Sequence, residues 1–194
     1  MPLLPMEPFI SPDHLLTAPA PPPGDSCWWV LHTRPRAEKA LARKVLRQEM
    51  SFFLPLYEKR WRSRGRLLCS HVPLFPGYLF LHGDREARRR AFETNLVANC
   101  LPVPDQEQLR TDLYGVYQLM TSGAPLTPEQ RLQPGTRVEV VAGPLAGLEG
   151  TVLRAGTRMR FYIEVSFLQR GVSAEVEGWM IRPLEGTRPA VSPR

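Results

Sequence analysis

The residues best suited to binding chemistry in this sequence are cations gathered around an aromatic side chain. Between Lys59 and Arg66 the chain carries Trp61 among five cationic residues, with Gly65 at the expected tip of a hairpin. Flexible arginine and lysine side chains reach phosphates well, so the segment predicts a nucleic-acid contact. A solvated surface loop is an equally good interpretation. The five cations are Lys59, Arg60, Arg62, Arg64 and Arg66.

Catalytic and metal-binding patterns are missing from the sequence. It has no GxSxG, HExxH, GxxxxGK[ST] or strand-following GxGxxG motif. The odd number of cysteines (Cys27, Cys69 and Cys100) shows no CxxC spacing, and the four histidines show no ligand spacing. We therefore expect a binding protein with free thiols in a reducing compartment, and neither an enzyme nor a holder of a metal or cofactor.

The net charge of +6 is concentrated in the middle of the chain. From Cys27 to Gly123 there are 16 basic and 9 acidic residues, against 9 and 7 from Ala124 onwards. This excess favours an anionic partner for the middle segment. No apolar run approaches the roughly 20 residues that a membrane helix needs, and the N-terminus has no basic region followed by an apolar core. We expect a cytoplasmic protein with no membrane contact.

The order of the expected elements predicts an α+β fold with a ferredoxin-like βαββαβ N-terminal domain and one extra helix. Ala37, Leu41 and Val45 form the apolar stripe of the first helix, and Asp84 is the expected N-cap of the second. The elements are strand 28–34, helix 36–50, strand 52–57 with its partner 72–82, helix 85–93, strand 97–103 and helix 105–120.

Composition divides the chain into two domains, a linker and two tails. Eight prolines before Asp25 predict a disordered tail over 1–26, and residues 186–194 form a second one. The N-terminal domain covers 27–121, and residues 122–133, rich in Pro, Thr and Gln, read as a linker. Short alternating strands with glycine turns over 134–185 predict a small SH3-like β-barrel.

The stretch from Pro73 to His82 poses the functional question. In a strand starting at Tyr78, Tyr78 and Phe80 share one face while Leu79 and Leu81 share the other, and both faces are apolar. The helices account for Leu79 and Leu81. Because nothing else in the sequence obviously covers the other face, we expect Tyr78 and Phe80 to be open for docking.

Two stretches together resemble the NusG-type transcription elongation and antitermination factors. The first is Trp28-Trp29-Val30-Leu31, a helix, and then Phe75-Pro76-Gly77-Tyr78-Leu79-Phe80, which looks like the family's N-terminal (NGN) domain. The second is Gly135-x-x-Val138-x-Val140-x-x-Gly143-Pro144-Leu145-x-Gly147-x-x-Gly150-x-Val152, which resembles the KOW motif. The resemblance covers Cys27 to Leu184 and includes the order of the two domains.

The resemblance implies a bacterial, monomeric protein that docks on the clamp helices of the largest RNA polymerase subunit and favours processive elongation. The resemblance also implies that Arg34, Arg36 and the Lys59–Arg66 hairpin lie near DNA or nascent RNA. A ribosomal protein of the small subunit or a termination factor would bind the barrel. The implied polymerase contacts are Tyr78, Phe80, His32, Val30 and Phe75, a second polymerase contact is Arg88, Arg89 and Arg90, and the barrel contacts are Leu145, Leu148, Phe167 and Leu168.

Departures from the family pattern favour a specialised paralogue that suppresses termination in a subset of operons. Leu145 and Leu148 stand where phenylalanines are common, and Gln169-Arg170-Gly171 replaces a glycine turn. The housekeeping elongation factor stays an alternative. A ribosome-associated RNA-binding protein that uses the barrel and the basic hairpin is a rival of another class.

Overall fold

The computed structural model describes residues 8–19, 26–129, 136–155, 158–177 and 180–184, and the predicted C-terminal tail lies outside them. The chain divides into two compact units, Met1–Arg110 and Thr111–Arg194. Helix α3 (Gln106–Thr121) begins in the first unit and continues into the second, whereas the sequence places all of it with the N-terminal domain.

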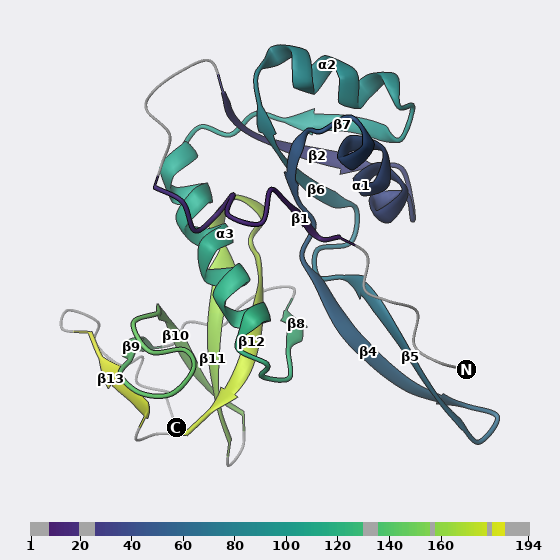
Figure 1. Cartoon of the computed structure of the whole chain (residues 1–194). Coiled ribbons are helices and arrows are strands. Elements are labelled where there is room, and N and C mark those ends of the chain that lie inside the picture. The colour runs from purple at the N-terminus through teal and green to yellow at the C-terminus, as the bar shows by residue number, and fades with distance from the viewer. Residues whose placement is uncertain (1–7, 20–25, 130–135, 156–157, 178–179, 185–194) are drawn as a thin grey trace, which may run out of the picture. The chain divides into compact units, whose positions relative to one another are not determined.

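The first unit is built on an antiparallel sheet with the order β1-β3-β6-β2-β7 (Figure 1). Strands β2 and β6 lie at its centre, with Val30 opposite Phe80 and Leu31 opposite Leu79. The strands are β1 (Ile10–Ser11), β2 (Cys27–Thr33), β3 (Ser51–Phe53), β6 (Tyr78–Gly83) and β7 (Val97–Leu101).

Two helices, α1 (Glu38–Arg47) and α2 (Arg85–Glu93), contribute to the core over one face of this sheet. The predicted stripe of α1 is confirmed, because Leu41 and Val45 are buried in one cluster with Leu31, Leu79 and Leu81 of the sheet. The predicted cap of α2 is also confirmed: the Asp84 carboxylate accepts a hydrogen bond from the Ala87 amide at 2.8 Å. The sequence therefore identified the helix-bearing face correctly.

Strands β4 (Leu56–Ser63) and β5 (Arg66–Pro73) form a separate two-stranded hairpin that projects from the first unit (Figure 1). The expected continuous strand pair 52–57 and 72–82 is wrong, because both strands break at prolines. Pro55 separates β3 from β4, and residues 74–77 separate β5 from β6. At this junction the Leu74 amide donates to the Pro55 carbonyl at 2.8 Å. A proline has no amide for a sheet ladder, so the hairpin leaves the main sheet here.

Residues 8–19, here called the N-terminal strap, are folded against the first unit. Their proline content predicts disorder, and this prediction is wrong. Ile10 pairs with Phe53 of β3, and the Leu54 amide donates to the Phe9 carbonyl at 2.6 Å. Pro8 and Pro12 flank the short strand instead of interrupting it, so no ladder donor is lost. The rest of the predicted tail, 1–7 and 20–25, lies outside the described residues.

At its far end the strap is held by α3. The Arg110 guanidinium donates to the Ala18 carbonyl. One turn earlier, the Gln106 side chain accepts from the Trp28 amide at 2.6 Å and donates to the Trp28 carbonyl at 3.1 Å. The strap thus runs from the β3 edge to the start of α3, on the side of the sheet away from α1 and α2 (Figure 1).

The second unit is rich in β-structure, as the sequence predicts. Its sheet has the order β13-β9-β10-β11-β12-β8, and β8 lies within the expected linker. Gly143 and Gly147 adopt φ values of +83° and +88° between β9 and β10, which confirms the expected glycine turn. On α3 the Asp112 carboxylate accepts from the Ser166 amide at 2.8 Å. The strands are β8 (Thr127–Glu129), β9 (Thr136–Val140), β10 (Glu149–Ala155), β11 (Arg158–Val165), β12 (Arg170–Val176) and β13 (Ile181–Pro183).

Candidate functional site

The face of the first sheet opposite α1 and α2 carries rows of aromatic side chains, here called the aromatic face. Cross-strand pairing between β2 and β6 places Trp28 beside His82 with ring centroids 5.0 Å apart, and His32 beside Tyr78 at 5.3 Å. Burial, followed by the charge of Arg110, lowers the pKa of His82, so the inner end of this face favours a neutral imidazole. The expected sharing of one face by Tyr78, Phe80, Val30 and His32 agrees with this register.

The middle of the aromatic face is buried. Phe80 is 0% exposed, with the ring of Phe75 edge-on at 6.0 Å and the ring of Phe53 at 6.4 Å, and Val30 is equally buried. The expectation that Phe80 is an open anchor is therefore wrong. The side chain of His32 is exposed and that of Tyr78 is half-buried. The surface available to a partner is the His32–Tyr78 end, here called the docking edge, with a packed aromatic layer behind it.

The turn before Tyr78 is fixed by a carboxylate that the sequence analysis missed. Gly77 has a φ of +87°, and its amide donates to the buried Glu38 carboxylate at 2.7 Å. The Gly77 carbonyl in turn accepts from the Thr33 amide at 2.8 Å. These bonds connect the first turn of α1 to both central strands, and so position the docking edge. An acidic residue in the first helical turn was the available signal, although this usually indicates a favourable helix dipole.

We expect Glu38→Ala to lower the free energy of unfolding by about 1–3 kcal/mol, because the Gly77 amide loses its acceptor in a part-buried site. Glu38→Gln keeps an acceptor oxygen and should recover most of the loss. Chemical denaturation followed by circular dichroism measures both. Equal losses for the two variants would contradict this reason, because Gln keeps both the volume and an acceptor oxygen, and would show that the site needs the negative charge.

The basic hairpin presents the predicted cations to solvent. Ser63 pairs with Arg66, and the two residues between them, Arg64 and Gly65, have φ values of +49° and +74°. Positive φ at both central positions is the type I′ arrangement that suits a two-residue hairpin. All side chains from Lys59 to Arg66 are exposed. Sequence reasoning thus located the tip correctly.

One hairpin cation is already engaged within the hairpin. The Arg60 guanidinium donates to the Glu58 carboxylate, which lowers the pKa of Glu58, and Cys69 adds a smaller effect in the same direction. Burial and the neighbouring Glu58 raise the pKa of the Cys69 thiol, so this cysteine is protonated rather than a reactive thiolate. The hairpin therefore offers positive charge rather than nucleophilic chemistry.

Arg34 and Arg36 follow β2 and lie on the same unit, away from the hairpin strands. Both side chains are exposed, and Arg36 has a φ of +60°. The Arg34 amide donates to the Leu96 carbonyl at 2.8 Å, which fixes its backbone while the guanidinium stays accessible. These two residues are suitable for phosphate contact, although the structure gives no direct contact between them and the hairpin.

Arg88, Arg89 and Arg90 of α2 have partners within the unit. Arg88 lies over the rings of Trp29 and Phe92, at 5.2 and 5.5 Å from their centroids. Arg90 donates to the Gln48 carbonyl at 2.8 Å. These contacts indicate that Arg88 and Arg90 stabilise the packing of α2 against the sheet and against the end of α1.

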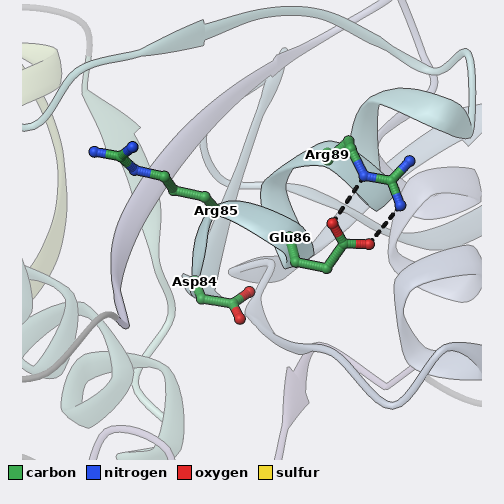
Figure 2. A pocket seen from close by; sticks show the side chains of 4 residues that line it. All are labelled: Asp84, Arg85, Glu86 and Arg89. Carbon is green, nitrogen blue, oxygen red and sulfur yellow. Dashed lines mark hydrogen bonds and ion pairs between the residues drawn. The ribbon is translucent and has the colours of Figure 1, made fainter.

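Arg89 lies between the carboxylates of Glu86 and Glu93, with Nε to Glu86 Oε2 at 2.8 Å. Glu86 and Arg89, joined by the ion pair that Figure 2 shows, line a pocket of about 600 Å³ at the start of α2. Asp84 and Arg85 complete its lining, and Asp84 is already used as the helix cap. Three of the four lining residues are thus engaged in the ion pair or the helix cap, and Arg85 points away from that pair (Figure 2).

The expected partner contacts of the second unit differ in accessibility. Leu145 is buried, with its carbonyl accepting from the Leu148 amide at 3.1 Å, so it belongs to the core of this unit rather than to its surface. Leu148 is half-buried. Phe167 and Leu168 are also half-buried and lie in the single 3₁₀ turn Ser166–Leu168, which Gln169 ends with a φ of +50°. A partner can reach three of the four.

Within the described part of the chain, no group of three or more His, Cys, Asp and Glu side chains is arranged to hold a metal ion. In the same residues, no helix combines the length and the apolar character needed to cross a bilayer.

Comparison with known proteins gives a family match and a similar solved structure. The family model described as "Transcription termination factor nusG" matches residues 26–125. Among solved structures, the crystal structure of the MjSpt4:Spt5 complex in conformation B is similar at 13% sequence identity, covering 83% of this chain and 99% of that chain, with a TM-score of 0.27. No curated protein matches the sequence.

Proposed function

The chain belongs to the NusG family of transcription factors, and on that basis we propose that it docks on RNA polymerase, promotes processive elongation and suppresses termination. Membership of this family makes it a transcription elongation factor in general, and not an enzyme. The proposed docking site is the clamp-helix region of the largest polymerase subunit. A role at a subset of operons, in a bacterial cytoplasm, is the finer part of the proposal.

The single observation that carries the proposal is the docking edge. The rings of exposed His32 and half-buried Tyr78 lie tilted against each other with their centroids 5.3 Å apart, and Tyr78 directly follows the turn that Glu38 fixes. A rigid aromatic pair of this kind is a typical hot spot at a protein interface. Phe80, Val30 and Phe75 support the edge from the core instead of making the contact themselves.

In the same proposal the first unit is a ferredoxin-like NGN domain and the second a small SH3-like KOW barrel. The order β3-β6-β2-β7 with two helices against one face supports the first assignment, and the family match over 26–125 supports the predicted extent 27–121. Leu148, Phe167 and Leu168 are the proposed contacts of the barrel with a small-subunit ribosomal protein or a termination factor. Arg88, Arg89 and Arg90 are the proposed second polymerase contact, and a partner there would compete with the contacts that their guanidinium groups already make.

The proposed nucleic-acid contacts are Arg34, Arg36 and the exposed cations of the hairpin. They would lie against upstream or non-template DNA, or against nascent RNA, once the first unit is bound to the polymerase. Their exposure and the absence of acidic residues from Lys59 to Arg66 support this role.

Co-purification with core RNA polymerase free of nucleic acid tests the docking proposal. We expect the double variant His32→Ala, Tyr78→Ala to lose binding by roughly 2 kcal/mol or more, about 30-fold, because a central aromatic contact is removed. The matched control is Tyr57→Ala, His71→Ala, which removes the same two residue types from the hairpin. A folded His32/Tyr78 variant that binds like the wild type contradicts the proposal.

A further inference from the structure

The hairpin exposes apolar side chains that a purely phosphate-binding arm does not need. Trp61 is 41% exposed, Leu68 36% and Leu67 66%, and they are the large exposed apolar side chains of the first unit among the described residues. All three lie on β4 and β5, between the cations. Packing within the protein does not explain a tryptophan that is exposed on a projecting hairpin, so a binding role is the better explanation.

Cross-strand register places Trp61 and Leu68 on one face of the hairpin. Trp61 pairs with Leu68, and paired residues on neighbouring strands project to the same side. Lys59 precedes Trp61 by two residues, and Arg66 precedes Leu68 by two, so both cations share this face. Leu67 pairs with Arg62 and lies on the opposite face.

On this face the apolar pair is thus flanked by charge along the arm. Two residues of a strand span about 7 Å, so Lys59 lies on the side of the hairpin base and Arg66 on the side of the tip. An indole face between two cations matches the pattern of single-strand binding surfaces, where a base stacks on the ring and the phosphates on either side meet lysine or arginine. In a duplex the base faces are already stacked and offer nothing to Trp61.

We propose that the Trp61–Leu68 face of the hairpin binds single-stranded nucleic acid by stacking one unpaired base on Trp61, with Lys59 and Arg66 on the adjacent phosphates. This inference rests on the proposed nucleic-acid role of the hairpin. It adds that the ligand is single-stranded and that Trp61 is the residue that contacts its unpaired base. An acidic protein surface would also meet the cations, but it would not need an exposed indole between them. Charge and ring together favour a polynucleotide.

Fluorescence anisotropy of labelled oligonucleotides with the full chain tests the inference. The probes are oligo(dT) and oligo(U) of about 15 nucleotides, which distinguish DNA from RNA, and a DNA duplex of the same length. We expect Trp61→Ala to weaken binding of the single strands by roughly 5- to 150-fold and to leave duplex binding and its salt dependence nearly unchanged. Trp61→Phe keeps a stacking ring and should retain most of the affinity.

The matched control is Leu67→Ala, an apolar truncation on the opposite face, which should bind every probe like the wild type. Since Trp61 and Leu67 are both exposed, neither change removes core packing, and circular dichroism checks this. Equal effects of Trp61→Ala on single strands and duplex, or an equal effect of Leu67→Ala, would overturn the inference.

Binding to none of the three probes would also overturn it, and would point to a protein partner for the hairpin. Co-purification with core polymerase is measured separately on the same variants. If Trp61→Ala has no selective effect while His32→Ala, Tyr78→Ala still abolishes polymerase binding, the stacking inference fails and the docking proposal stands.

Discussion

Phe80→Ala is expected to lower the free energy of unfolding of the first unit by about 3–5 kcal/mol, the cost of removing a buried aromatic ring from a well-packed core. Phe80 is 0% exposed, and the rings of Phe53 and Phe75 lie against it. Tyr78→Ala, two residues earlier on the same face, should cost only about 1 kcal/mol, since Tyr78 is half-buried. Amide hydrogen exchange of β2 and β6 in the native protein measures both losses without contributions from the second unit.

The contrast between these two residues matters for any functional experiment. If both were equally open, a Tyr78/Phe80 double variant would be a clean test of docking. Because Phe80 is buried, loss of polymerase binding by that variant would reflect unfolding as well as a missing contact. If Phe80→Ala and Tyr78→Ala lower the free energy of unfolding by the same amount within experimental error, the distinction between a buried Phe80 and an accessible Tyr78 is contradicted.

The regular elements could be predicted from the sequence because their signals are local. Leu41 and Val45 recur at helical spacing, and Asp84 caps the helix that follows it. Gly65 takes its positive φ at the tip of the hairpin, where a glycine is expected. Each of these features depends on neighbours a few residues away, so pattern and propensity suffice.

The packing of the aromatic face could not be predicted in the same way. Alternation along β6 shows that Tyr78 and Phe80 share a face, but it does not show that the rings of Phe53 and Phe75 pack against Phe80. Convergence depends on where the chain turns before β6, and that turn is held by a bond between Glu38 and Gly77, 39 positions apart. Side-chain bonds to distant backbone groups leave no periodic trace in a sequence.

The N-terminal strap shows the same limit more strongly. Its proline content is typical of disorder, and this composition outweighs the two short apolar pairs Phe9-Ile10 and Leu15-Leu16 in a prediction from local sequence. Pairing of Ile10 with Phe53 is a contact over 40 positions, and the bond from Arg110 to the Ala18 carbonyl spans 92. Only the complete fold brings these partners together.

Leu16→Ala is the second large effect that the structure predicts, with a loss of about 2–3 kcal/mol in the free energy of unfolding. Leu16 is 2% exposed, between the β1 pairing with β3 and the Arg110 bond to Ala18. Truncating a buried leucine costs about 2–5 kcal/mol in the free energy of unfolding. The strap can open locally while the rest of the unit stays folded, so the expected loss lies at the low end of this range. The neighbouring Leu15 is half-buried, so Leu15→Ala is a matched control with a loss of about 1 kcal/mol or less.

Hydrogen exchange at the Leu54 amide separates the two ways in which the strap can respond to this change. That amide donates to the Phe9 carbonyl, so its protection depends directly on the strap staying in place. If Leu16→Ala opens the strap alone, the Leu54 amide loses protection while the amides of β2 and β6 keep theirs. If the strap and the aromatic face unfold together, all three lose protection equally, and the strap is then part of the core that supports His32 and Tyr78. An unchanged Leu54 amide in Leu16→Ala would contradict the assignment of Leu16 as the residue that holds the strap.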